Sequence, residues 1–224
     1  SDSMSPGQIS ELSESAELAF RADFAGEIPP RAERYWRGLT LSHYDGRTWQ
    51  QAVPQGQPEA QYLYRRGDDK PDWYQRLESR RAPQQQSYRY QVIVEPTQRR
   101  WLFSLDVPFP LYGDVALAKD MRLLANQPVS ERFAYRVDSV PAVAAAINLT
   151  GQERQLMLSI PEDAGRKARG LAQQWRLESD SSWDIVQRAL RYFREQPFHY
   201  TLRPPRLTAD PVDDFLFRTR RGFC

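Results

Sequence analysis

Residues 88–95 read Tyr-Arg-Tyr-Gln-Val-Ile-Val-Glu, so that from Tyr88 onward an aromatic or apolar side chain falls on every second position. A period of two places these side chains on one face of a β-strand. Further stretches of the same kind lie on both sides, at residues 19–25, 34–41, 101–105, 121–125 and 133–140. Seven or eight short strands with turn residues between them predict an antiparallel, β-sandwich-like region.

A β-hairpin is predicted at residues 44–49, Tyr-Asp-Gly-Arg-Thr-Trp, because Gly46 adopts a positive φ at little cost. The polar stretch that follows, residues 50–87, is too long for one uninterrupted loop. We expect a short strand at residues 62–64 and a turn of helix at residues 73–77 within it. Its run of glutamines, residues 84–86, is interpreted as a solvated loop rather than as an acyl-donor substrate.

The hydrophobic period changes to that of helices after about residue 150. Residues 162–176 and 182–195 each place apolar side chains along one stripe, and Ser181 or Ser182 can cap the second helix. Asp210-Pro211-Val212-Asp213 then has the pattern of another helix start, with Asp210 as the N-cap. We therefore expect an α+β fold, with a β-rich domain at residues 1–145 and a helical domain at residues 146–224.

The balance of charges argues against a nucleic-acid-binding protein. The 31 Lys and Arg residues against 29 Asp and Glu residues leave a net charge of +2, which is too small for a basic binding surface. No run of about 18 apolar residues occurs, so these residues are not expected to cross a bilayer. Neither metal-ligand spacing nor a Gly-rich phosphate loop is present, so no metal or cofactor is expected.

Cys224 is the candidate nucleophile. As the sole cysteine it forms no intrachain disulfide, and it follows Gly222 and the basic run Arg-Thr-Arg-Arg at residues 218–221. Free backbone N–H groups and arginine charges favour a thiolate, although an isolated cysteine is more often an inert core residue. A nucleophilic cysteine needs a base. Of the two histidines, we interpret His43 as a surface residue and His199 as packed among aromatic residues.

Two further groups of residues have a chemical and a structural interpretation. Asp213 and Asp214 are adjacent carboxylates, but neighbours on a helix do not face each other, so capping explains them better than acid–base chemistry. Several tryptophans could stack sugars, but their strand and helical spacings favour the core. These are Trp36, Trp49, Trp101, Trp175 and Trp183.

Five segments together form a recognisable combination. They read Tyr-Trp-Arg-Gly-Leu at residues 35–39, Tyr-Asp-Gly-Arg-Thr-Trp at 44–49, Phe-His-Tyr-Thr-Leu at 198–202, Asp-Pro-Val-Asp-Asp-Phe-Leu-Phe at 210–217 and Arg-Gly-Phe-Cys at 221–224. The combination resembles the bacterial transglutaminase-like proteins of the TgpA type. The resemblance covers nearly the whole chain, and its most specific element is the Gly-Phe-Cys ending.

Proteins of this family are multi-pass inner-membrane proteins with a large periplasmic domain, in which a β-rich region precedes a transglutaminase-like core of the papain-like class. The resemblance implies that this chain is the N-terminal part of such a domain, and that residues 146–224 are the incomplete helical start of the core. It implies that Cys224 attacks a glutamine carboxamide and passes the acyl group from a thioester to a lysine amine. The implied partners are protein substrates at the cell envelope.

Catalysis by residues 1–224 alone is not expected, because the family's catalytic His and Asp follow the cysteine, whereas His199 precedes it. Exposed apolar surface is expected near Trp175, Trp183 and Phe193. Two alternatives stay open. One is a transglutaminase-like cysteine peptidase or amidase on the same core; the other is a non-catalytic module whose β domain binds a periplasmic partner or a cell-wall polymer.

Overall fold

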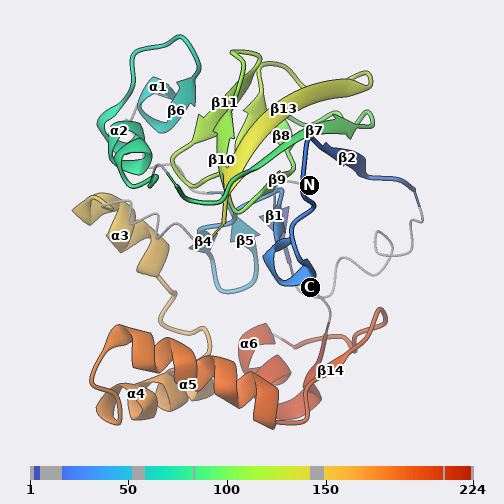
Figure 1. Cartoon of the computed structure of the whole chain (residues 1–224). Coiled ribbons are helices and arrows are strands. Elements are labelled where there is room, and N and C mark those ends of the chain that lie inside the picture. Colours follow the sequence, from blue (N-terminus) through green and yellow to red (C-terminus); the bar gives the residue numbers. More distant parts are fainter. Residues whose placement is uncertain are drawn as a thin grey trace. The chain divides into compact units, whose positions relative to one another are not determined.

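The computed structural model describes residues 3–5, 17–51, 59–82, 84–141, 149–208 and 210–222. The chain divides into two compact units (Figure 1). The β unit comprises Glu17–Thr40 and Val53–Arg154, and the helical unit comprises Ser1–Ala16, Leu41–Ala52 and Gln155–Cys224. The domain boundary predicted at residue 145 lies outside the described residues. The predicted hairpin belongs to the helical unit rather than to the β unit.

The first sheet of the β unit is built around the strand whose alternation is clearest. Its antiparallel order is β10-β13-β7-β2, with β10 at Val107–Pro110, β13 at Phe133–Val140, β7 at Tyr88–Val94 and β2 at Phe20–Phe24. The predicted face of β7 is confirmed, because Tyr88, Tyr90, Val92 and Val94 are all buried. Phe20 and Phe24 of β2 also pack against the core, as their spacing predicts.

A second antiparallel sheet has the order β6-β11-β12-β8. Its strands are β6 (Leu63–Arg65), β11 (Val115–Ala118), β12 (Leu123–Ala125) and β8 (Trp101–Leu102). A separate pair joins β3 (Trp36–Arg37) to β9 (Ser104–Leu105). The predicted strand at residues 101–105 is thus divided at Phe103, whose backbone N–H and C=O both bond to the Tyr135 hydroxyl, at 2.9 and 2.7 Å.

Two strands of the β unit carry no alternation and were not predicted. Strand β10 reads Val-Pro-Phe-Pro, and proline normally indicates an edge strand or a turn. It does lie at the edge of its sheet. Strand β11 reads Val-Ala-Leu-Ala with every side chain buried, a short apolar run that periodicity cannot assign.

Short helices complete the β unit. They are η1 (Arg31–Glu33), α1 (Glu59–Tyr62) and α2 (Asp72–Ser79). The helix predicted at residues 73–77 is confirmed as α2, which buries Trp73, Tyr74 and Leu77. The strand predicted at residues 62–64 is present one residue later, as β6.

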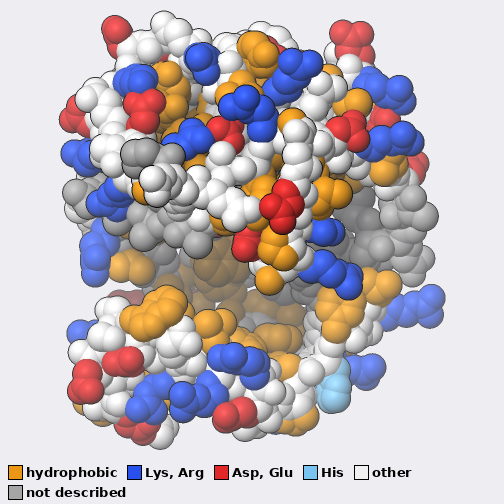
Figure 2. Space-filling model, viewed as in Figure 1, with side chains coloured by type: hydrophobic (Ala, Val, Ile, Leu, Met, Phe, Trp, Pro, Cys, Tyr) orange, Lys and Arg blue, Asp and Glu red, His pale blue; other side chains and the backbone are white. Residues whose placement is uncertain are grey.

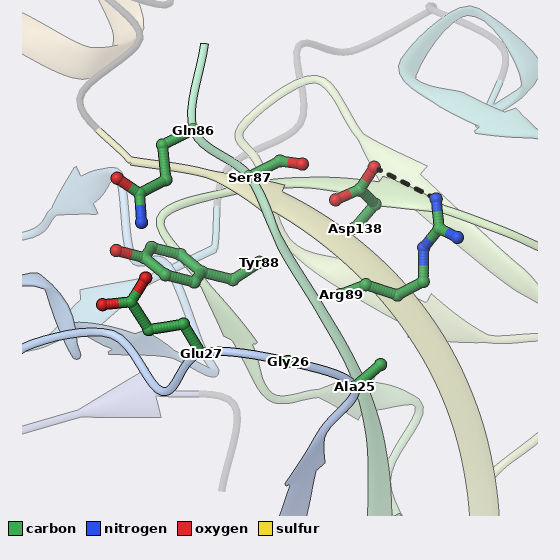
Figure 3. Close-up of a pocket in the computed structure, with 8 residues that line it drawn as sticks. All are labelled: Ala25, Gly26, Glu27, Gln86, Ser87, Tyr88, Arg89 and Asp138. Carbon is green, nitrogen blue, oxygen red and sulfur yellow. Dashed lines mark ion pairs between the residues drawn. The ribbon is translucent and has the colours of Figure 1, made fainter. Parts of the chain in front are cut away.

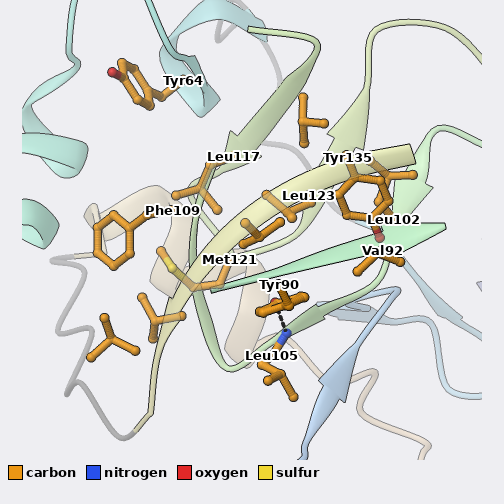
Figure 4. Close-up of a cluster of buried hydrophobic side chains, with 14 of the residues drawn as sticks. Tyr64, Tyr90, Val92, Leu102, Leu105, Phe109, Leu117, Met121, Leu123 and Tyr135 are labelled. Carbon is orange, nitrogen blue, oxygen red and sulfur yellow. Dashed lines mark hydrogen bonds between the residues drawn. The ribbon is translucent and has the colours of Figure 1, made fainter. Parts of the chain in front are cut away.

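Both sheets contribute side chains to one buried cluster, including Tyr90 and Tyr135 from the first and Leu117 and Leu123 from the second (Figure 4). The Tyr90 hydroxyl accepts the Leu105 N–H at 2.8 Å and bonds to Ser139 Oγ at 2.8 Å. These bonds satisfy a buried hydroxyl, as burial requires, and burial raises the pKa of Tyr90 to about 12. The α+β class is confirmed, while the finer sandwich-like arrangement stays a prediction.

Helix α3 (Gly151–Leu158) was not predicted from the sequence. Its Glu153 is 1% exposed and therefore needs partners. The carboxylate accepts hydrogen bonds from Lys119 Nζ at 2.6 Å, from the Thr150 N–H at 2.6 Å and from the Tyr62 hydroxyl at 3.1 Å. Burial alone would raise the pKa of Glu153, but the bonds from Lys119 and Thr150 bring it below its ordinary value.

The helical unit contains the two long helices that the sequence predicts. Helix α5 (Ser182–Glu195) has the predicted bounds, and Ser181 caps it by accepting the Asp184 N–H. Helix α4 (Arg166–Leu177) begins four residues later than predicted, because Gly165 has a left-handed φ of +61° at its N-cap. The rest of the unit comprises β1 (Ser3–Met4), β4 (His43–Tyr44), β5 (Trp49–Gln50), β14 (His199–Tyr200), α6 (Pro211–Asp213), η2 (Asp214–Thr219) and β15 (Arg221–Gly222).

None of the helices in the described part of the chain combines the length and the apolar character that crossing a membrane requires.

Candidate functional site

Cys224 itself lies outside the described residues, so the site is built from the elements that lead to it. Strand β15 pairs in parallel with β14, so that His199 is opposite Arg221 and Tyr200 is opposite Gly222. The His199 N–H donates to the Arg220 carbonyl at 2.8 Å, and the Thr201 N–H donates to the Gly222 carbonyl at 2.8 Å. The backbone is therefore held by a neighbouring segment up to the second residue before Cys224.

A π-helical turn, η2, comes directly before β15. It ends where the Arg220 N–H donates to the Phe215 carbonyl at 2.9 Å, with Arg220 in a left-handed conformation at φ +47°. This is an uncommon conformation for a residue other than glycine. The Arg220 side chain is held by Gln196 Oε1 at 3.3 Å and lies 5.8 Å from the centre of the Phe198 ring. These contacts fix the direction in which β15 leaves the turn.

Gly222 lies close to the ring of Phe215. A Cβ atom at position 222 would be 3.3 Å from the Phe215 ring, which is tighter than ordinary van der Waals contact. Phe215 is itself part of an aromatic cluster, with ring centroids 5.3 Å from Phe198 and 6.4 Å from Phe193. The absence of a side chain at residue 222 thus allows β15 to pass over this cluster.

Asp210 and Asp213 connect the start of α6 to the start of α4. Asp210 caps its own helix, as predicted, by accepting the Asp213 N–H at 3.1 Å, and its second oxygen accepts the Gly165 N–H at 2.8 Å. The Asp213 carboxylate accepts the N–H groups of Lys167 and Ala168 at 2.8 and 2.9 Å. The interpretation of Asp213 as a capping residue is confirmed, but the helix that it caps is α4.

This second capping role was missed from the sequence. Helix α4 has Gly165 at its N-cap and no side-chain cap of its own. Its first N–H groups therefore need acceptors from elsewhere. A helix that begins after glycine, in a chain with an Asp-rich segment further on, was the signal that could have revealed this partnership.

Asp214 forms a separate, solvent-exposed ion pair in the same segment. Its carboxylate accepts two hydrogen bonds from Arg218, both 2.8 Å long, and one from the Thr208 N–H at 2.5 Å. The Arg218 bonds, followed by those of Thr208, hold the pKa of Asp214 well below its usual range. The charge of Arg218 is compensated by this pair, so Arg218 does not provide the free positive charge that the basic run suggested.

The hairpin β4–β5 lies beside this network. Its predicted Gly46 has a φ of +98°, and Pro161 and Ala164, which precede α4, are 3.5 and 3.6 Å from the position of a Cβ atom there. Tyr44 is buried and donates to the Gly46 carbonyl at 2.6 Å. Burial, followed by the charges of Asp210 and Asp45, raises the pKa of Tyr44 to about 12. The structure thus brings together two of the segments that carry the family resemblance.

Both interpretations of the histidines are wrong. His199 is exposed, and the aromatic packing is made by the preceding residue, Phe198, with Tyr192 and Phe193. His43 is half-buried rather than on the surface, and its Nδ1 has no hydrogen-bond partner among the described residues. Within those residues, His, Cys, Asp and Glu side chains form no group of three that could hold a metal ion.

The tryptophans differ between the two units. In the β unit, Trp36 packs edge-on against Phe20 and Tyr90, and Trp101 against Phe103. In the helical unit, Trp183 is 67% exposed, and Leu190 and Phe193 of the same helix are 48% and 43% exposed. Apolar side chains are accordingly visible at the surface over α4 and α5 (Figure 2). The predicted apolar surface is thus present at Trp183 and Phe193, while Trp175 is half-buried against Tyr192.

Comparison with known proteins assigns the chain to a family. Residues 1–145 match the TgpA N-terminal domain. The whole chain is 42% identical to the protein-glutamine gamma-glutamyltransferase of Pseudomonas aeruginosa, of whose length it spans 31%. It is also similar to the crystal structure of the periplasmic domain of TgpA from that organism, with 40% identity, a TM-score of 0.81 and coverage of 100% of this chain and 72% of that one.

A second crystal structure, of the same domain bound to ethylmercury, also has a TM-score of 0.81 with this chain, which covers 73% of the solved chain. The family match covers residues 1–145 and the structural match covers all 224 residues, so together they include the five segments that carry the resemblance. This chain therefore belongs to the TgpA family of bacterial transglutaminase-like proteins.

Proposed function

We propose that the full-length protein is a protein-glutamine γ-glutamyltransferase in which Cys224 is the nucleophile. The observation that carries this proposal is the 42% identity, over all 224 residues, to a relative of that name. Because the chain spans 31% of that relative, the activity belongs to the longer protein rather than to these residues alone.

The proposed reaction has two steps. The Cys224 thiolate attacks the carboxamide carbon of a glutamine side chain, the C–N bond breaks, and ammonia leaves with a proton from the catalytic base. The resulting thioester is then attacked by a lysine amine, which loses a proton, forms the isopeptide bond and releases the thiolate. Covalent catalysis of this kind divides one difficult acyl transfer into two easier steps.

The backbone that leads toward Cys224 is held in place up to Gly222, which supports the proposed role of the cysteine. The β14 ladder, the π-helical turn and the contact between Gly222 and Phe215 each restrict the backbone before Cys224. Holding a reacting group in one place lowers the entropic part of an activation barrier. Asp210 and Asp213 affect the position of Cys224 only indirectly, because their carboxylates connect the start of this segment to the start of α4. We assign them as positioning residues.

Residues 1–224 alone are proposed to be inactive. A cysteine nucleophile needs a base and a group that orients it. His199 is exposed on a strand whose register pairs it with Arg221, and it does not match the family's catalytic histidine. His43 lies in β4 of the hairpin. Neither histidine is therefore assigned as the base.

We further propose that the chain is periplasmic and that its full-length parent is anchored in the inner membrane. The solved relative is described as a periplasmic domain, which supports the first part. The proposed partners are a glutamine-donor protein and a lysine-acceptor protein of the cell envelope.

The test is incorporation of a labelled primary amine into a glutamine-rich protein by three proteins: the full-length form, its Cys224→Ala variant and residues 1–224. The proposal expects incorporation by the full-length wild type alone. Incorporation by the Cys224→Ala variant would contradict the role of the cysteine. Release of ammonia without incorporation would instead identify the amidase alternative, since water would then resolve the thioester, and cleavage of a peptide bond would identify the peptidase alternative.

A further inference from the structure

Strand β2 is the longest edge strand of the two four-stranded sheets in the described part of the chain. It has five residues and lies at the end of its sheet, next to β7 (Figure 1). The other edge strands, β6, β8 and β10, have three, two and four residues. Strand β10 also contains two prolines, which lack the N–H groups that pairing needs. Neither proline nor glycine interrupts β2, so its edge is open to a further strand.

The register of β2 and β7 shows which backbone groups face this open edge. Ala25 lies just beyond β2, beside the part of β7 that carries Arg89 (Figure 3), and its N–H donates to the Arg89 carbonyl at 2.9 Å. Bonded and non-bonded pairs alternate along an antiparallel ladder. The N–H and C=O groups of Phe20, Ala22 and Phe24 therefore point away from β7. They make no hydrogen bond to any other strand or loop among the described residues.

Two charges of opposite sign lie on the outer face of β2. Arg21 and Asp23 are both exposed, and the β7 residues opposite them carry no charge. Neither side chain forms an ion pair within the described ranges. Further along the same face, Arg89 of β7 lies opposite Asp138 of β13, with 3.9 Å between guanidinium and carboxylate (Figure 3). The sheet thus pairs arginine with aspartate across strands wherever a partner strand supplies the opposite charge.

We propose that β2 pairs antiparallel with β2 of a second copy of the chain, about a two-fold axis at Ala22. A two-fold interface has to be self-complementary, and the sequence Phe-Arg-Ala-Asp-Phe at residues 20–24 has this property. Arg21 lies opposite the partner's Asp23, and Asp23 lies opposite the partner's Arg21. Both charge pairs fall at non-hydrogen-bonded positions, where facing side chains are closest.

The inner face of the strand is complementary in the same register. Phe20 lies opposite the partner's Phe24, and aromatic pairs of this kind stabilise adjacent strands. The free backbone groups of Phe20, Ala22 and Phe24 meet their equivalents on the partner subunit, so that each strand bonds to the other along its full length. The two four-stranded sheets would then form one continuous sheet.

Other registers are less favourable. A shift of two residues places either Arg21 opposite the partner's Arg21 or Asp23 opposite the partner's Asp23, and like charges directly opposite are destabilising. A shift of one residue directs the free backbone groups at residues that already bond to β7, and it places inner-face side chains opposite charged ones. Parallel pairing in register also puts like charges side by side, and it does not close into a symmetric dimer.

A second copy fits this edge better than an unrelated peptide, because the complementarity is contained in the strand itself. The contact is small, so the dissociation constant is expected to be on the order of 100 µM. Strand β2 belongs to the β unit, so this inference is independent of Cys224 and of the proposed acyl transfer.

Sedimentation equilibrium of the 224-residue chain, at concentrations up to about 1 mM, measures the dissociation constant of the dimer. Asp23→Arg places arginine opposite arginine at both positions, and Arg21→Asp places aspartate opposite aspartate. Each variant alone should raise the dissociation constant about tenfold or more. An equimolar mixture of the two variants restores both charge pairs and should form a mixed dimer with about the wild-type affinity.

Two controls separate this pairing from general effects of charge or misfolding. Glu131→Arg makes the same change of charge at an exposed residue of the β unit outside the edge, and it should leave the dissociation constant unchanged. The chain that carries Arg21→Asp together with Asp23→Arg keeps the complementarity and should dimerise as the wild type does. A wild type that stays monomeric at about 1 mM, single variants that dimerise equally well, or a mixture that does not recover the dimer would overturn the proposal.

Discussion

The β unit and the helical unit are each stabilised internally by a different kind of contact. In the β unit, two four-stranded sheets share a cluster in which Val92, Leu117 and Val137 are completely buried. In the helical unit, α4 and α5 bury no residue, and the start of α4 is joined to α6 by hydrogen bonds that the Asp210 and Asp213 carboxylates accept from backbone N–H groups. The comparison shows that the unit that leads to Cys224 combines polar capping contacts with a partly exposed aromatic cluster, whereas the other depends on a buried core.

The largest expected effect is in the core of the β unit. Leu117 is 0% exposed, so Leu117→Ala should lower the free energy of unfolding by about 3 kcal/mol through lost burial and the cavity that remains. The measurement is denaturant unfolding of the chain. Leu190→Ala in α5 is the matched control and should cost less than about 1 kcal/mol, because Leu190 is 48% exposed. Equal costs would remove the distinction between the units.

The next largest effect concerns the capping of α4. Asp213→Ala removes the acceptors for the Lys167 and Ala168 N–H groups, which should destabilise the helical unit by about 1–2 kcal/mol. Loss of helical circular dichroism on heating measures it. Asp180→Asn is the control, because Asp180 is exposed and lies between α4 and α5 rather than in a cap contact. A similar loss in both variants would show that charge, rather than capping, is responsible.

A smaller effect should appear as a dependence on pH. The pKa of Asp214 is lower in the folded chain than its ordinary value of 3.8. A group whose folded pKa is depressed stabilises the fold above its unfolded pKa, and this contribution is lost as the pH falls. The stability difference between wild type and Asp214→Asn should therefore be present at pH 7 and shrink below about pH 4. A difference of the same size at pH 7 and pH 3 would contradict the ion pair with Arg218.

The smallest expected effect is a gain in stability. Gly170 lies inside α4, and a Cβ atom there would meet nothing within 4 Å. Gly170→Ala should therefore stabilise the helical unit by up to about 1 kcal/mol, because alanine loses less backbone entropy in a helix. Thermal unfolding measures the gain. Gly222→Ala is the contrasting change, since its Cβ would be 3.3 Å from the Phe215 ring, and a gain at that position too would argue against the close contact.

The sequence predicted the elements whose position follows from a local pattern of residues and does not depend on distant parts of the chain. The alternation in β7 and β13 and the stripe along α5 gave their positions, and Asp210-Pro211 gave the start of α6. It did not predict β11, which has no alternation, or α3, whose buried Glu153 is stabilised by distant residues. The partnership of Asp213 with α4 was missed for the same reason, because Asp213 is 45 positions from Ala168 and 46 positions from Lys167 in the chain.

Hydrogen exchange in the wild type and in Asp213→Ala tests most directly the claim that different contacts stabilise the interior of each unit. We expect slow exchange in β7 and β13 of both proteins, because these strands lie in the core. We expect faster exchange in α4 and α5 of the wild type, and a further increase in α4 of the variant alone. Equal protection of both units in the wild type, or a parallel loss in β7 and α4 of the variant, would contradict the account.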